Sequence, residues 1–138
     1  VLYRAYDLAG TKGPLRVWEF TESWEHLEGL SNTNAADLLS LRARIAGGFR
    51  DFELAWRLMD QALALDANSS WIWTERAGLL LTEERYEEAE QACQRSLEIS
   101  PWYRPAVQTR LLGPYRRYRS AHWRQRPRRL ARGRRPAA

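Results

Sequence analysis

The stretch YEEAEQACQRSLEISP at residues 86–101 is the clearest indication of the fold. Its apolar and small residues recur every three or four positions, so they lie on one face of an α-helix. These residues are Tyr86, Ala89, Cys93 and Leu97. Glutamate fills most of the opposite face, and Pro101 cannot continue a helix because its ring removes a backbone N–H donor. The pattern predicts an amphipathic helix over residues 85–99.

The same pattern occurs earlier in the chain, at a constant offset. This offset, the separation between Phe52 and Tyr86, is called the repeat period below. The matching residues are Phe52, Ala55, Met59 and Leu63. A second set of matches at the same offset pairs Leu39 with Trp73 and Ala43 with Ala77. Two units of equal length, 36–69 and 70–103, are therefore expected to hold two helices each. The predicted helices are 36–47, 51–65, 70–82 and 85–99, and the predicted fold class is all-α.

The two units resemble the tetratricopeptide repeat (TPR) family, whose repeats have the same length as these units. Large apolar residues stand at position 4 of each unit, aromatic residues at position 17 and alanine at position 20. These residues are Leu39, Trp73, Phe52, Tyr86, Ala55 and Ala89. The resemblance implies an antiparallel helix-hairpin array, a short α-solenoid. The chain departs from the family at position 7, where Arg replaces the usual Leu, and at Ala67, where the family has Pro.

Residues 1–35 precede the first unit and are expected to form a capping helix or a diverged repeat. The segment 14–30 begins with a proline and ends near Gly29, which is the usual asymmetry of a helix. Its expected apolar stripe consists of Leu15, Trp18, Trp24 and Leu27, and Val17 and Phe20 are expected to widen it. Because a repeat of this kind is stabilised by its neighbours, such a helix would cover the open side of the first unit.

The C-terminal part of the chain departs from the repeat. Residues 104–114 begin a third unit, which Gly113 and Pro114 are expected to end or kink. Residues 115–138 contain Arg at nearly every second position and no acidic side chain, and we expect them to be disordered. Two interpretations of this tail remain: a native basic tail, or a shifted reading frame in GC-rich coding sequence.

Composition argues against an enzyme. Cys93 is the only cysteine, and His26 and His122 are the only histidines, so a zinc site or a catalytic triad has too few residues. No Gly-rich phosphate-binding loop is present. We therefore predict a non-catalytic protein that needs no metal or cofactor.

The sequence also predicts the cellular compartment of the protein. No apolar run reaches the roughly 18 residues of a membrane-spanning helix, and residues 1–10 lack the pattern of a secretory signal. A single cysteine fits a reducing compartment, and the near-absence of lysine indicates a GC-rich coding bias. We expect a cytoplasmic, bacterial protein. The sequence begins without Met, which fits a fragment or a reading frame with a non-standard start, and we expect a fragment of a longer repeat protein.

The TPR resemblance implies a peptide-binding groove lined by the first helix of each unit. Positions 2, 5, 9 and 12 of the family tend to face this groove. Carried over to this chain, they are Asp37, Ser40, Arg44 and Gly47, then Trp71, Thr74, Gly78 and Leu81. The Lys and Asn that clamp a peptide's C-terminal carboxylate in part of the family are missing from these positions. The predicted function is a scaffold that binds a protein or peptide, other than a chaperone tail.

Arg42, Arg76 and Arg110 form a column at position 7 of the three units. Three placements remain open for it. The side chains can extend to solvent along the helix pair, pair with acidic groups or carbonyls of neighbouring helices, or point into the groove and hold an acidic ligand.

The basic tail supports an alternative function. Residues 1–109 carry 11 basic and 17 acidic side chains, a net charge of −6, whereas residues 110–138 carry 11 Arg and no acid. With Tyr115, Tyr118 and Trp123 between them, these arginines suit nucleic acid or an anionic surface. The arginines singled out are Arg116, Arg117, Arg119, Arg124, Arg126, Arg128 and Arg129. Two further expectations are a regulatory module of a larger enzyme, and self-association through the uncovered end of the second unit.

Overall fold

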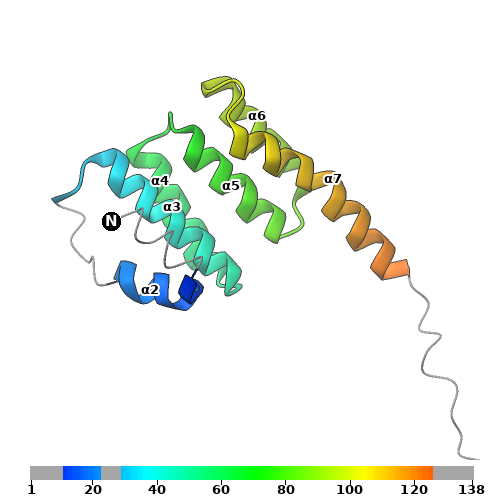
Figure 1. Ribbon diagram of the computed structural model, residues 1–138, viewed down its shortest axis with the longest axis horizontal. Helices are drawn as coiled ribbons and strands as arrows, with labels where there is room; N and C mark the ends of the chain where they lie inside the picture. The colour runs from blue at the N-terminus through cyan, green and yellow to red at the C-terminus, as the bar shows by residue number, and fades with distance from the viewer. Residues whose placement is uncertain (1–10, 23–28, 126–138) are drawn as a thin grey trace, which may run out of the picture.

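The computed structural model describes residues 11–22 and 29–125, and within these ranges the chain is all-α. The described helices are α2 (Pro14–Glu22), α3 (Asn32–Gly48), α4 (Phe52–Leu65), α5 (Ser70–Thr82), α6 (Tyr86–Ile99) and α7 (Arg104–Gln125). The described residues include no strand, so the predicted fold class is confirmed at this level. Helices α3, α5 and α7 lie side by side in one layer, with α4 and α6 behind them (Figure 1).

The helices follow the repeat period of the sequence. Helix α6 begins and ends one period after α4, α5 ends one period after α3, and α7 begins one period after α5. The turns repeat as well, because Arg50 and Glu84, which are also one period apart, have positive φ angles of 65° and 62°. Helices α3 and α4, and likewise α5 and α6, are joined by short turns of equal length and form two helical hairpins.

Short polar side chains fix where the helices begin. Ser31, Asp51 and Ser69 precede α3, α4 and α5, and each accepts a hydrogen bond from the backbone N–H three residues later. Such caps satisfy backbone donors that the first helical turn leaves without a partner.

The two hairpins share their cores through α5. Ile72 and Leu79 of α5 are buried with residues of α3 and α4, so the second hairpin completes the core of the first. The second core joins Ala77, Leu80 and Leu81 of α5 to small residues of α6. Because α5 serves both cores, the hairpins are expected to unfold together rather than independently.

Helix α2 covers one side of α3 with part of the expected apolar stripe, namely Val17, Trp18 and Phe20. Val17 of α2 is buried with Leu41 and Ile45 of α3, and Trp18 and Phe20 pack against them. Leu15 is 58% exposed, so its place in the predicted apolar stripe is wrong. Trp24 and Leu27 lie outside the described residues.

Helix α7 corrects the prediction for the C-terminal part. It passes through Gly113 and Pro114 as one helix and ends at Gln125, so the expected end at 113–114 and the disorder expected over 115–125 are wrong. Tertiary contacts explain the continuation: Arg117 pairs with Glu87 at 3.0 Å, and Ser120 hydrogen bonds with residues of the second hairpin. These contacts offset the backbone hydrogen bond that Pro114 removes. Residues 126–138 lie outside the described part of the chain.

Candidate functional site

Two arginines of the column, Arg76 and Arg110, each contact the helix that precedes their own in the chain. The Arg76 guanidinium lies 4.9 Å from the ring centre of Trp56 and 3.4 Å from an Asp60 carboxylate oxygen. Arg110 donates a 2.8 Å hydrogen bond to Glu90, which lies one repeat period after Trp56. Arg76 and Arg110 therefore contact equivalent positions of the unit before their own, occupied by Trp56 and Glu90. Each arginine also has an acidic partner on a neighbouring helix.

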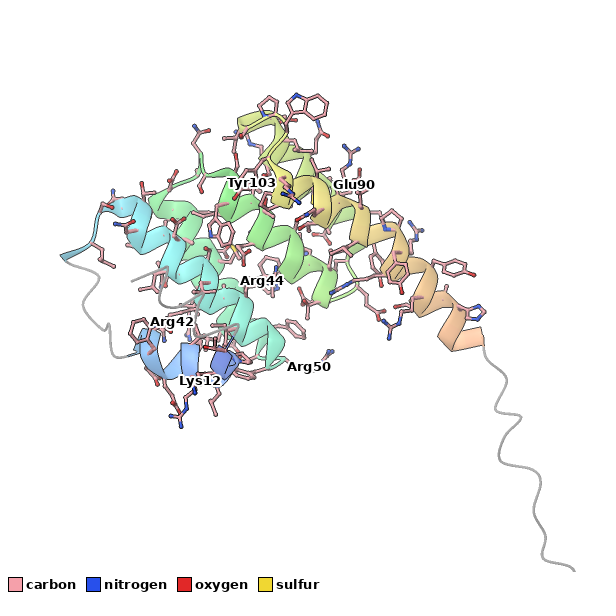
Figure 2. The ribbon with its side chains drawn as sticks, viewed as in Figure 1. Lys12, Arg42, Arg44, Arg50, Glu90 and Tyr103 are labelled. Atoms are coloured by element: carbon pink, nitrogen blue, oxygen red, sulfur yellow. The ribbon has the colours of Figure 1, made fainter. Side chains whose placement is uncertain are left out.

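Arg42 differs from the other two arginines in its partner. Its guanidinium lies 4.7 Å from the ring centre of Trp18 on α2, a cation–π distance. Figure 2 labels Arg42 near α2, away from the α3–α5 contact where Arg44 lies. The column therefore joins successive helices to one another. Sequence reasoning missed the tryptophan partners, although Trp56 and Arg76 have the same separation in the chain as Glu90 and Arg110.

Most of the predicted groove residues are buried in the interior. Ser40, Gly47, Thr74, Gly78 and Leu81 are all buried. The Ser40 hydroxyl donates to the carbonyl of Asp37 at 2.9 Å, and the Thr74 hydroxyl donates to the carbonyl of Ser70 at 2.8 Å. The side chains of Ser40 and Thr74 are therefore closed to a peptide, whereas Leu81 contributes to the wall of a groove against α7. Trp71 packs on the first core and is only partly exposed.

The remaining groove residues belong to a charged surface that we call the Glu75 surface, made of Asp37, Arg44, Glu75 and Tyr103. Arg44 of α3 crosses to α5, where its Nε lies 3.8 Å from Glu75 Oε2. Gly78 makes this crossing possible, because a Cβ at position 78 would overlap the Arg44 guanidinium. Figure 2 shows Arg44 and Tyr103 on the layer formed by α3, α5 and α7. Sequence reasoning included Asp37 and Arg44 but missed Glu75 and Tyr103.

Burial and mutual repulsion govern the ionisation of the Glu75 surface. Burial raises the pKa of Glu75, while the Arg44 charge opposes this effect. Burial also raises the pKa of Asp37, and the nearby Asp66 carboxylate adds to the increase. The pKa of Tyr103 is raised by burial and by the charges of Glu75 and Asp37. Negative charge is thus concentrated at this surface. A cation bound there would reduce the repulsion between its acidic groups.

The C-terminal half of α7 forms a second exposed surface, which we call the basic end of α7. It consists of Tyr115, Arg116, Tyr118, Arg119 and His122. Tyr118 and His122 stack with ring centres 5.9 Å apart, and both tyrosines are exposed. Arg116 and Arg119 line a groove of about 440 Å³ against the α5–α6 turn.

The other arginines of the predicted basic tail are placed only in part. Arg117 is exposed as well, but it pairs with Glu87 of α6 at 3.0 Å, so its charge is partly compensated within the chain. Arg124 falls within α7, and Arg126, Arg128 and Arg129 lie outside the described residues.

Cys93 is the one thiol of the chain, and its surroundings suppress its reactivity. The side chain is buried in the second core. Burial raises the pKa of Cys93 to about 11, with a further contribution from Glu90. The thiol is therefore protonated at neutral pH and is a poor nucleophile. Among the described residues, no group of three His, Cys, Asp or Glu side chains is placed to hold a metal ion.

No known family model matches the chain, and no curated protein matches it either. Within the described ranges, no helix combines the length and apolar character needed to cross a membrane. Function is therefore inferred from the geometry of the two surfaces.

Proposed function

We propose that this chain is a TPR-like, non-catalytic scaffold that binds an extended protein segment across α3, α5 and the start of α7. The regular spacing of helix ends and turns, one repeat period apart, supports the TPR-like arrangement. It also explains why side chains of successive units meet on one face of the α3–α5–α7 layer.

The Glu75 surface is the observation that carries this proposal. The Glu75 side chain is only 13% exposed, and its contact with Arg44, at 3.8 Å, is longer than a hydrogen bond. The carboxylate therefore has acceptor capacity that Arg44 does not satisfy. A lysine or arginine side chain, or a backbone N–H, of a bound peptide would supply a charge-assisted hydrogen bond there. The expected ligand is a peptide with a basic residue at one position.

A positional-scanning hexapeptide array probed with the full chain tests this proposal. We expect the wild type to prefer peptides with Lys or Arg at one position. Glu75→Gln should lower that preference about tenfold or more, because hydrogen bonds to charged groups contribute about 1.5–3 kcal/mol. Gly78→Ala should increase it, because the new Cβ displaces the Arg44 guanidinium and leaves the Glu75 charge less compensated.

A control variant and a check of folding accompany this array. Glu53→Gln removes an exposed carboxylate of α4 and should leave the preference unchanged. In Gly78→Ala the helix propensity of alanine, about 1 kcal/mol better than that of glycine, opposes the loss of the Arg44–Glu75 contact, and a wild-type circular dichroism spectrum verifies that this variant is folded. An array without a preferred basic residue, or a preference that persists in Glu75→Gln, contradicts the proposal.

The basic end of α7 supports a second candidate function, the binding of single-stranded nucleic acid. Tyr115 and Tyr118 are exposed on the same helix as Arg116 and Arg119, which form no ion pair within the described residues. Exposed aromatic rings can stack on bases while arginines contact phosphates. The absence of acidic side chains after Thr109 removes a competing internal partner for these arginines on their own helix.

Binding of labelled oligothymidine at several salt concentrations tests this second function. We expect an Arg116→Ala, Arg119→Ala double variant to bind more weakly and to reduce the slope of log affinity against log salt by about 1.4. An Arg16→Ala, Arg95→Ala double variant removes two charges elsewhere and serves as the control. Equal effects of the two double variants, or no binding by the wild type, would exclude the basic end of α7 as a nucleic-acid site.

A further inference from the structure

An apolar groove lies between α6 and α7, away from the Glu75 surface. Its volume is about 640 Å³. The apolar residues along it are Leu97, Pro101, Trp102, Val107, Leu111 and Pro114. Trp102 is 90% exposed and Leu111 is 70% exposed, which is unusual for residues of this size. Glu90, labelled in Figure 2 beside α7, forms an ion pair with Arg110 at the edge of the groove.

The preceding unit shows how such a groove is covered. Ala77 and Leu80 lie one repeat period before Leu111 and Pro114, and they are only 0% and 2% exposed. They are buried because α6 packs over them with Ala89, Ala92 and Cys93. The α4–α5 groove is therefore filled by an amphipathic helix that presents small residues. The α6–α7 groove occupies the equivalent repeat positions, but Leu111 stands where the earlier groove has Ala77, so a helix that fills it needs small residues on its contact face.

The described part of the chain does not supply this helix. The second hairpin turns back at Glu84, but at Tyr118, one repeat period later, α7 continues as a helix. The last residues, 126–138, contain six Arg and no acid. These arginines would repel α7, because α7 itself carries Arg and no acidic residue. Pairing α7 with the α7 of a second copy would meet the same repulsion.

We propose that the α6–α7 groove binds an acidic amphipathic helix of a partner protein, with small residues on its contact face. Leu111 and Trp102 are larger than Ala77 and Asn68, the residues one repeat period earlier, so the side chains opposite them must be small. Carboxylates on the partner would pair with Arg104, which lies on the Val107–Leu111 face of α7 by its spacing of three. This surface is separate from the Glu75 surface, so either proposal can fail alone.

A peptide with the sequence of α6 itself is the test probe, because α6 fills the equivalent groove. We would label residues 85–100 with Cys93→Ala and measure fluorescence anisotropy against the full chain. We expect saturable binding that Leu111→Glu weakens at least tenfold, since the new carboxylate repels the acidic peptide and removes apolar contact. Leu15→Glu, which alters an exposed leucine of α2, should leave the affinity unchanged.

Three results would overturn this proposal. One is no saturable binding at about 1 mM peptide, the weak limit for a specific site. Another is equal binding by the wild type and Leu111→Glu. The third is a concentration-dependent dimer in light scattering that Leu111→Glu abolishes, which assigns the groove to a second copy. Because Leu111 is exposed, Leu111→Glu should keep the wild-type circular dichroism spectrum, and Trp102→Ala provides an uncharged second variant that should also weaken binding.

Discussion

Ile72→Ala is expected to lower the free energy of unfolding by about 3 kcal/mol. Ile72 belongs to α5, yet it is fully buried in the core built mainly by α3 and α4. Truncation to alanine removes apolar burial and leaves a cavity at the place where the two hairpins join. Since single domains of this size are stable by only about 5–15 kcal/mol, the loss is a large fraction of the total.

Urea unfolding followed by circular dichroism measures this effect. Leu65→Ala on α4 is the control, because Leu65 is exposed and its truncation should change stability by less than about 1 kcal/mol. Equal losses in the two variants would contradict the shared core. So would an unchanged transition in Ile72→Ala, because it would mean that the hairpins do not depend on each other.

Pro114→Ala is expected to stabilise the second half of α7 by up to about 3 kcal/mol. The proline sits inside the helix, where it has no N–H to donate to the carbonyl of Arg110 and its ring crowds that carbonyl. Alanine restores the hydrogen bond. Amide hydrogen exchange over residues 115–125 should slow by as much as about 100-fold, the ratio that corresponds to this free energy.

Pro105→Ala is the matched control for this prediction. Pro105 is the second residue of α7, and a proline in the first helical turn is tolerated because its N–H would have no partner in the helix. This variant should therefore leave exchange over residues 115–125 nearly unchanged. If the two substitutions have the same effect, or if Pro114→Ala has none, α7 does not continue through Pro114 as described.

The repeat period and the apolar spacing were sufficient to predict the two hairpins, although α3 begins at Asn32, before the predicted start at residue 36. The predicted helices 51–65 and 85–99 differ from α4 and α6 only by starting one position earlier, because the apolar spacing and the following turns define both ends. The continuation of α7 could not be predicted in the same way. Local propensity at Gly113 and Pro114 favours an end, and only contacts with residues distant in the sequence, such as Glu87 and Glu84, compensate for it.

The candidate site was predictable only in part. The side chains of Ser40 and Thr74 were expected to face a groove, but short hydroxyl groups can hydrogen bond to a carbonyl of their own helix and so tolerate burial. Glu75 carried no signal in the sequence, because its importance comes from the crossing of Arg44 over Gly78. The arrangement of these three residues from two helices is a tertiary property.

Amide chemical-shift mapping of the full chain is the sharpest test of peptide binding at the Glu75 surface. The titrant is the best-bound hexapeptide from the positional-scanning array. We predict the largest shifts at Asp37, Arg44, Glu75, Gly78 and Tyr103, and their loss in Glu75→Gln. Shifts confined to Tyr115–His122, or to the α6–α7 groove around Trp102 and Leu111, would contradict binding at the Glu75 surface and move the ligand to one of the other two surfaces.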